Sequence, residues 1–307
     1  MLTTCVCGGM TGRAARRARS GFTLAEVILV MVVGGAVLAL VFSIGTLLTR
    51  QLAAASSRVG AIQQLNDAAA ILPLDLRMLS PSIGDIRAGE ARDTSLEFRS
   101  TVMSAVTCAA ERWAIVLAPF WSGHRRPQQA TPQVDDSLWF LADDETAEHW
   151  EVARIRSVQL STGSCTTLRA GGGNDELYDR SRLITIGVDS KTNGVAGAPA
   201  RITRPARYSL YKAGDGLWYL GLRSWNGAAR RFNTVQPVSG PYRRPVGGRF
   251  GLDFRYYDSL DNRLSVATLE TNRIARIEVR LIADAGDSTR AARSDSLLLA
   301  VALRNRR

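Results

Sequence analysis

The longest uninterrupted apolar segment of the chain lies close to its amino terminus. No charged residue occurs from Val27 to Leu48. As a helix with a rise of about 1.5 Å per residue, these residues span about 33 Å, which is enough to cross the hydrocarbon core of a bilayer. The segment therefore predicts one membrane-spanning helix.

A polar and apolar rhythm of helical period follows Arg50. Apolar residues recur every three or four positions, as on one face of an amphipathic helix: Leu52, Ala55, Val59, Ile62, Leu65, Ala69, Leu72, Leu76 and Leu79. Pro73 is a candidate kink, and Ser80-Pro81 is expected to end the helix. We expect one long helix with a membrane half over residues 22–50 and an amphipathic half over residues 51–80.

From about residue 90 the pattern changes to short segments of alternating character, typical of strands. Alternation is regular from Phe250 to Tyr256 and from Ile277 to Ala283, and Lys212–Gly216 has the composition of a hairpin turn. Leu297–Leu303 predicts a final strand. The predicted fold is α+β: a long N-terminal helix packed on a mostly antiparallel β head over residues 81–307.

The net charge of 39 − 28 = +11 is concentrated at the two ends of the chain. Four arginines precede the apolar segment (Arg13, Arg16, Arg17, Arg19) and three end the chain (Arg304, Arg306, Arg307), which leaves 11 − 4 − 3 = +4 for the rest. Such a distribution is a weak signal for nucleic-acid binding. By the positive-inside rule it places the N-terminus in the cytoplasm and the head outside.

A secretory signal peptide is the alternative for this segment, since Ala53-Ala54-Ala55 could serve as a cleavage site. The apolar run is, however, longer than the ~7–15 residues of such signals. Neither interpretation explains Glu26, a carboxylate at the start of the apolar segment, where an ionisable group is costly unless it is paired or functional.

The sequence from Arg19 to Val27, Arg-Ser-Gly-Phe-Thr-Leu-Ala-Glu-Val, resembles the processing signal of type IV pilins and type II secretion pseudopilins. The resemblance implies that a prepilin peptidase removes residues 1–21 by cutting after Gly21, and that the new terminal Phe22 is N-methylated. A start at Met10 instead of Met1 would shorten this leader and delete Cys5 and Cys7.

The physical chemistry of Glu26 fits this resemblance. Cleavage would expose an ammonium group on Phe22, and Glu26 one helical turn later could pair with that group on a neighbouring subunit. In a medium of low dielectric such a pair is strong enough to set the axial register of bundled helices. Glu26 is therefore the candidate assembly residue.

Three C-terminal stretches resemble large minor pseudopilins, best those of the J class and the W-like minor pilins: residues 250–258, 273–281 and 301–305. The family implies a prepilin peptidase, other pilins and an inner-membrane assembly platform as partners. It also implies a single-pass protein of the inner membrane with a periplasmic or extracytoplasmic head. Residues 90–245 carry no family motif.

Cys108 and Cys165 lie on the side of the membrane predicted to be oxidising, where an isolated pair of cysteines indicates a disulfide. Two unpaired thiols are the alternative. A bridge over a loop of this size would stabilise the fold by ~4 kcal/mol in the chain-entropy model.

The sequence offers few candidates for catalysis or metal binding. Only two histidines occur, His124 and His149, and both are expected at the surface or at strand ends. Acidic groups that could bind calcium, but are expected to be solvated, are Asp135-Asp136, Asp143-Asp144-Glu145 and the cluster Asn174, Asp175, Glu176 and Asp179. We expect no cofactor, no metal and no enzymatic activity.

An interleaved set of arginines and aromatic residues is the basis of an alternative function. It comprises Arg223, Arg230, Arg231, Arg243, Arg244, Arg249 and Arg255 with Trp225, Phe232, Tyr242, Phe250 and Tyr256. These residues could bind single-stranded DNA in a DNA-uptake or adhesive pilin, although arginine stems that cover strand aromatics are the preferred interpretation. A membrane-anchored envelope enzyme is the remaining alternative to a minor pilin or pseudopilin.

Overall fold

The computed structural model describes residues 23–119, 131–143, 148–161, 165, 183–247, 250–284 and 295–303. The chain divides into two compact units, Met1–Ser56 and Ser57–Arg307. One helix, α1 (Leu24–Arg77), contributes its first part to the first unit and its last part to the second. The unit boundary therefore falls inside the predicted amphipathic half of the helix.

The last part of α1 buries one face in the second unit. Buried residues recur at three- and four-residue steps, as a helix packed on one side requires: Ala61, Leu65, Ala68, Leu72 and Leu76. The predicted stripe is correct at Leu65, Leu72, Leu76 and Leu79, but it is wrong before Leu65, where Val59 and Ile62 are exposed. The small residue on the buried face is Ala68 rather than Ala69.

The helix ends slightly before the predicted position. Pro73 lies inside α1, which continues to Arg77, and a short 3-10 helix, η1 (Pro81–Ile83), follows. The buried carboxylate of Asp85 accepts a hydrogen bond from the backbone N–H of Ser80 at 2.7 Å. This bond fixes the turn by which the chain leaves the helix and enters the first strand.

Antiparallel strands make up most of the second unit, which confirms the predicted α+β class. The first sheet contains β1 (Ile86–Ala91), β2 (Ser95–Glu111), β3 (Ala114–Pro119), β4 (Ser137–Asp143), β5 (Glu148–Ser161), β6 (Leu183–Val188), β7 (Pro199–Lys212), β8 (Trp218–Asn226), β9 (Arg231–Phe232) and β10 (Gln236–Tyr242). The second contains β11 (Leu252–Tyr257), β12 (Arg263–Leu264), β13 (Arg276–Ile282) and β14 (Ser296–Ala302), with the 3-10 turns η3 (Val266–Thr268) and η4 (Thr271–Arg273) between β12 and β13.

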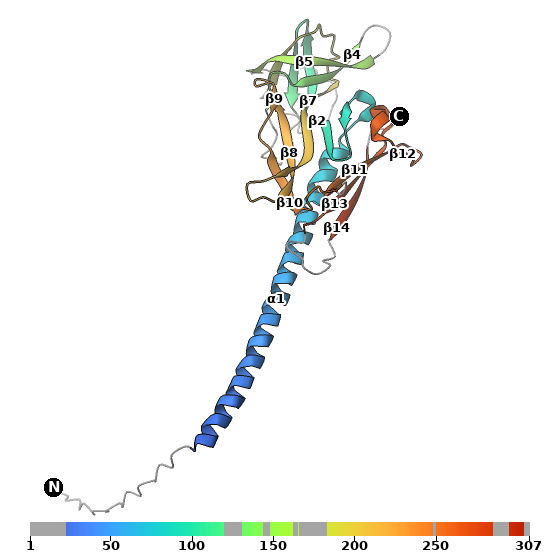
Figure 1. Cartoon of the computed structure of the whole chain (residues 1–307). Helices are drawn as coiled ribbons and strands as arrows, with labels where there is room; N and C mark the ends of the chain where they lie inside the picture. Colours follow the sequence, from blue (N-terminus) through green and yellow to red (C-terminus); the bar gives the residue numbers. More distant parts are fainter. Residues whose placement is uncertain are drawn as a thin grey trace, which may run out of the picture. The chain divides into compact units, whose positions relative to one another are not determined.

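Part of the first sheet closes into a barrel. Its order is β1-β2-β3-β6-β5-β4-β7-β8-β10, and β2 also pairs with β7, so that β2, β3, β6, β5, β4 and β7 form a closed ring. The order β3-β6-β5-β4 is that of a Greek key. Figure 1 shows β4 and β5 at the end of this unit opposite β10 and β14. The four strands β3–β6 are thus an insertion between β2 and β7, which complete the ring.

The described part of the second unit has two large hydrophobic cores, one around the last part of α1 and one inside the barrel. One joins the last part of α1 to β1, β2, β7, β8 and the second sheet, with Phe98, Tyr208, Tyr242, Phe254 and Tyr256 as its large aromatic members. In Figure 1 the helix passes between β8 and β10 on one side and β13 and β14 on the other. The other core fills the barrel with side chains such as Ile115, Leu138, Phe140, Ile186 and Ile202. The barrel interior is therefore packed and is not a channel.

Candidate assembly site

Glu26 lies in the first turn of α1. Its backbone N–H donates to the carbonyl oxygen of Thr23 at 3.1 Å and to the Thr23 hydroxyl at 3.3 Å, so Thr23 caps the helix. The Glu26 side chain is exposed, and the described part of the chain gives its carboxylate no ion pair. Gly21, Phe22, Met1 and Met10 lie outside the described residues.

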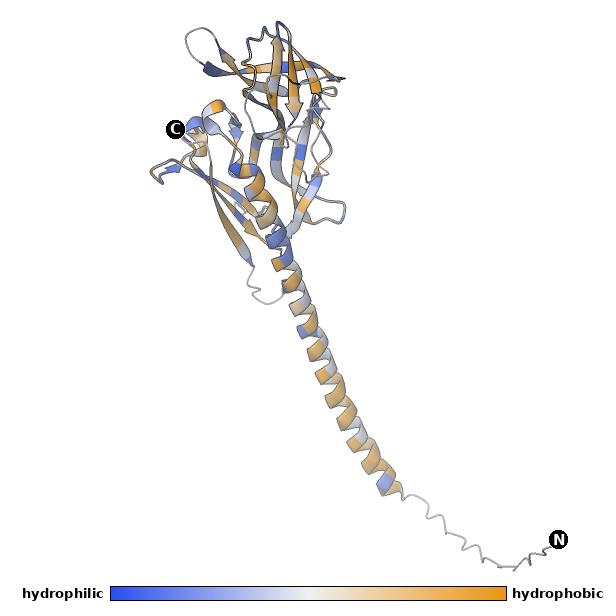
Figure 2. Ribbon diagram, turned by 180° about the vertical axis from the view of Figure 1, so that it is seen from behind, coloured by the Kyte–Doolittle hydropathy of each residue, from blue (hydrophilic) through white to orange (hydrophobic). Residues whose placement is uncertain are grey.

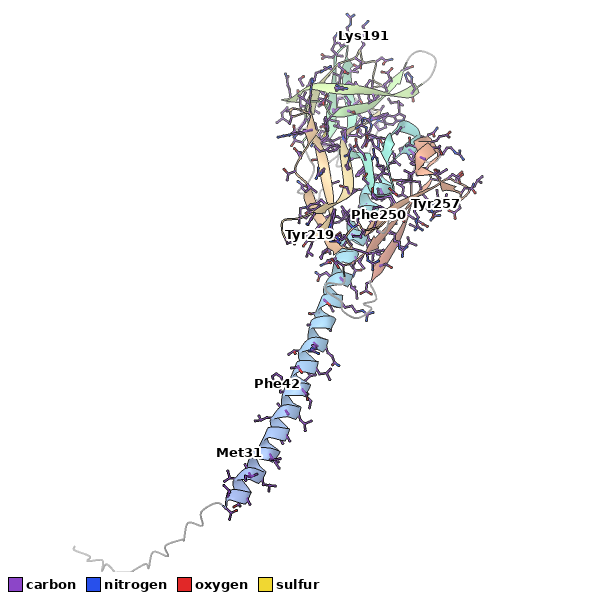
Figure 3. All side chains as sticks on the ribbon, in the orientation of Figure 1. Met31, Phe42, Lys191, Tyr219, Phe250 and Tyr257 are labelled. Atoms are coloured by element: carbon purple, nitrogen blue, oxygen red, sulfur yellow. A yellow bond between two sulfur atoms is a disulfide. The ribbon has the colours of Figure 1, made fainter. Side chains whose placement is uncertain are left out.

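The first unit presents apolar side chains on every side of the helix. The exposed fraction is 71% for Met31 and 75% for Phe42, and Figure 3 shows both side chains projecting from the helix. Figure 2 shows the same segment as almost continuously hydrophobic. A helix that is apolar all round is suited to a bilayer or to a bundle of similar helices, and this helix is long and apolar enough to cross a membrane.

Polar groups within this apolar segment are satisfied by the helix itself. The hydroxyl of Ser43 donates to the carbonyl of Leu40 at 2.8 Å, and that of Thr49 donates to the carbonyl of Thr46 at 3.0 Å. Hydroxyls bonded in this way are tolerated in lipid. A methyl group added at Gly34, Gly35 or Gly45 would meet no atom of the described chain within 4 Å.

Buried tyrosines fasten the last part of α1 to the head. The Tyr208 hydroxyl on β7 donates to a carboxylate oxygen of Asp75 at 2.6 Å, while its ring stacks on Phe98 with centroids 5.5 Å apart. The Tyr242 hydroxyl on β10 donates to the carbonyl of Gln64 at 3.3 Å. Sheet strands thus hold the helix at two points, about three turns apart, by directional bonds as well as by packing.

Burial of these hydroxyls disfavours their ionised form. Desolvation, followed by the charge of Asp75 and its hydrogen bond, raises the pKa of Tyr208 far above its ordinary value near 10. Desolvation raises the pKa of Tyr242 to about 12. These tyrosines are structural groups that stay protonated, with no sign of an acid or base tuned for chemistry near neutral pH.

The two head cysteines are joined. The Sγ atoms of Cys108, on β2, and Cys165 are 2.13 Å apart, and the Cα atoms are 5.2 Å apart. Both residues pack with Ala118 and Leu183 in a small apolar cluster against the barrel. The disulfide therefore ties the connection after β5 to the barrel wall.

The acidic and histidine candidates that the structure describes have polar partners, and one of them, contrary to the expectation, is not solvated. Asp136 is buried and binds the Arg204 guanidinium through two hydrogen bonds of 2.7 Å. A carboxylate oxygen of Asp135 lies 3.3 Å from a guanidinium nitrogen of Arg154, and the Nε2 atom of His149 lies 3.2 Å from a carboxylate oxygen of Glu151. Among the described residues no group of three or more histidine, cysteine or acidic side chains could hold a metal ion.

The remaining candidates of this kind lie outside the described residues: His124, Asp144, Glu145, Asn174, Asp175, Glu176 and Asp179.

The described members of the arginine and aromatic set do not form one surface, and Arg249 lies outside the described residues. Tyr242 and Tyr256 are fully buried in the core, so their faces are closed to nucleic-acid bases. Trp225 and Phe232 pack edge to face, and the Arg207 guanidinium lies 4.8 Å from the Phe232 ring centroid. The arginine that lies over Phe232 is therefore Arg207 of β7, which does not belong to the predicted set.

Sequence reasoning missed a charged network at the base of the barrel. The guanidinium carbons of Arg99 and Arg201 lie 5.6 and 5.5 Å from the ring centroid of Trp139, within cation–π range. Arg201 also contacts the buried carboxylate of Asp85 at 2.5 Å. The alternation of β2, β4 and β7 could have placed these side chains outward, but no local pattern indicates that three strands bring them together.

Comparison with known proteins identifies one segment of the chain. Residues 16–42 match the model of the prokaryotic N-terminal methylation motif. No curated protein and no solved structure matches the chain. The motif covers Gly21, Phe22 and Glu26 together with the start of the apolar helix, and it supports a type IV pilin-like subunit with a single N-terminal membrane anchor.

Proposed function

We propose that this chain is a minor pilin or pseudopilin, a structural subunit of a type II secretion pseudopilus or of a type IV pilus tip. The observation that carries the proposal is the methylation motif over residues 16–42, which coincides with a helix that is apolar all round and has Glu26 in its first turn. The size of the head favours a minor subunit, resembling the J class or the W-like pilins.

In this proposal a prepilin peptidase cuts after Gly21 and methylates Phe22, leaving a chain anchored in the inner membrane with its head outside. An assembly platform then moves the subunit into the filament. The exposed carboxylate of Glu26, which forms no ion pair within the described residues, meets the amino group of a neighbouring subunit's terminal phenylalanine. Apolar helices bundle around this pair, and the low dielectric makes a register without the pair costly.

Two measurements on the protein from its native cells test the proposal. Mass spectrometry of the mature N-terminus is expected to find a methylated Phe22; an N-terminus at any other residue would refute the processing step. Glu26→Ala is expected to remove the chain from sheared filaments while leaving it processed in the membrane. Gln51→Ala, at another exposed helix position, is the matched control and is expected to assemble normally.

A further inference from the structure

Apart from the two-residue strand β9, the two sheets end, within the described residues, in four edge strands, and three of them are protected against pairing. β1 has a register shift and Gly89 at a φ of 77°, β10 contains Pro237 and Pro241 with two register shifts, and β12 has two residues. Bulges, prolines and short edges are the usual devices that prevent one sheet from adding to another.

The fourth edge strand, β14, has none of these devices. Its seven residues, Ser-Leu-Leu-Leu-Ala-Val-Ala, contain no charge and no proline, and they pair with β13 in an unbroken register from Ser296 to Ala302. Among the described residues no strand lies on its other side. An uncharged edge of this length is a template for another strand.

The hydrogen bonds show which backbone groups face the open side. Ala283 donates its N–H to the carbonyl of Asp295 at 2.9 Å, and Leu303 donates to that of Ala275 at 3.0 Å. Because bonded positions alternate along an antiparallel strand, the odd-numbered residues between these ends face β13. The open groups therefore belong to Ser296, Leu298, Ala300 and Ala302, whose side chains are also exposed.

We propose that β14 is a docking edge that accepts an extended, uncharged segment of a different subunit of the same filament. The proposal rests on the proposed function, since it names the contact by which one head joins the next. Only an extended chain can satisfy a row of backbone donors and acceptors at strand spacing. Leu298, with 58% of its surface exposed, would give such a segment an apolar neighbour.

A second copy of this chain fits the edge poorly in either direction. In an antiparallel pair of β14 strands, the two-fold axis is perpendicular to the sheet. It would point the last parts of the two α1 helices, which pack on that sheet, in opposite directions, whereas in the proposed function both helices enter the same membrane. In a parallel pair, the axis would turn one sheet over and place the charged outer side chains of β13 (Arg276, Glu278, Arg280) beside the apolar face of the other sheet. The three other edges of a second copy are protected.

The test uses the full-length chain made in its native cells together with the other filament subunits. A photoreactive benzoylphenylalanine replaces Leu298, and the adduct formed on irradiation is identified by mass spectrometry. We expect an adduct with another chain that itself begins with a methylated residue. In the same background, Ala300→Pro removes one open N–H without touching a bond to β13. It is expected to lower the adduct yield about tenfold, equivalent to about 1.4 kcal/mol.

Matched variants make the result decisive. Ala300→Ser keeps the N–H and is expected to leave the adduct yield unchanged. Leu298→Lys places a charge on the edge and is probed from a photoreactive group at Ser296. It should lower the adduct yield, and it keeps the test valid if the proline variant fails to fold. Absence of an adduct, an adduct only with a second copy, or equal yields for the proline and serine variants would overturn the proposal. If Phe22 is methylated in these samples while the adduct is absent, the docking proposal fails but the processing step of the proposed function does not.

Discussion

Replacing Tyr208 by phenylalanine tests how the helix is held to the head. The change keeps the ring that stacks on Phe98 and removes only the hydroxyl that donates to Asp75 at 2.6 Å. Hydrogen bonds to charged groups contribute about 1.5–3 kcal/mol. Asp75 is half-buried and has a further interaction, which favours a value inside this range. We therefore expect the free energy of unfolding at pH 8 to fall by about 2 kcal/mol.

The pKa of the same hydroxyl predicts a pH dependence. The pKa of Tyr208 in the folded chain is raised above the ordinary value of 10.0, first by burial and then by Asp75. Its contribution to stability is therefore fully present below pH 10 and is lost as the pH rises above 10. Each such tyrosine makes the free energy of unfolding fall by up to about 1.4 kcal/mol per pH unit. Because the Tyr208→Phe variant lacks this hydroxyl, its free energy of unfolding should fall less steeply with pH above pH 10, by up to about 1.4 kcal/mol per pH unit.

The assay is urea unfolding of the chain in mild detergent, followed by tryptophan fluorescence between pH 8 and pH 11. Tyr211→Phe is the matched control, because Tyr211 lies on the same strand and its hydroxyl makes no hydrogen bond among the described residues. It should change the free energy of unfolding by less than about 0.5 kcal/mol. Equal stabilities of the Tyr208 and Tyr211 variants at pH 8, or equal slopes above pH 10, would refute this account of the helix attachment.

Two further predictions concern the barrel. Asp136→Asn is expected to lower the free energy of unfolding by about 3–5 kcal/mol because it leaves the buried Arg204 guanidinium without a compensating charge. In the double variant Asp136→Leu/Arg204→Met, urea unfolding should show that most of this loss is recovered. A double variant as unstable as the single one would contradict this account. Replacing Cys108 and Cys165 by serine opens a loop of sequence separation 57 and should cost about 4 kcal/mol. Thiol labelling with and without reductant checks that the wild-type bridge is present, and labelling without reductant would count against it.

The sequence was sufficient for the parts of the fold that local pattern determines. A charge-free run predicted the membrane part of α1. Strict alternation predicted β11 and β13, and the apolar segment Leu297–Leu303 predicted β14, all close to their observed bounds. The error at Val59 and Ile62 has a physical reason. Helical periodicity shows which side chains share a face, but not where along the helix another element begins to cover that face.

The barrel could not be predicted because it depends on pairings between distant strands. β2 pairs with β3 on one edge and with β7 on the other, and β7 lies about a hundred residues later in the sequence. A run of apolar residues such as Ile115–Leu117 predicts a buried strand, but it does not select the partner. The same limit applies to the assembly site: Glu26 was found from its motif, whereas the open edge of β14 follows from the order of strands in a sheet.

The shared strands explain how an inserted barrel and a helix-bearing base can act as one head. The register of β2 and β7 runs from the pair Ser95 and Ser209, beside the helix, to the pair Val106 and Pro199 in the barrel wall. Bending between the two parts would therefore require breaking a ladder whose ends lie in different cores. The Tyr208–Asp75 bond connects the same ladder to α1. A force applied to the helix would reach the barrel through hydrogen-bonded strands, so substitutions that loosen this ladder should weaken both parts together.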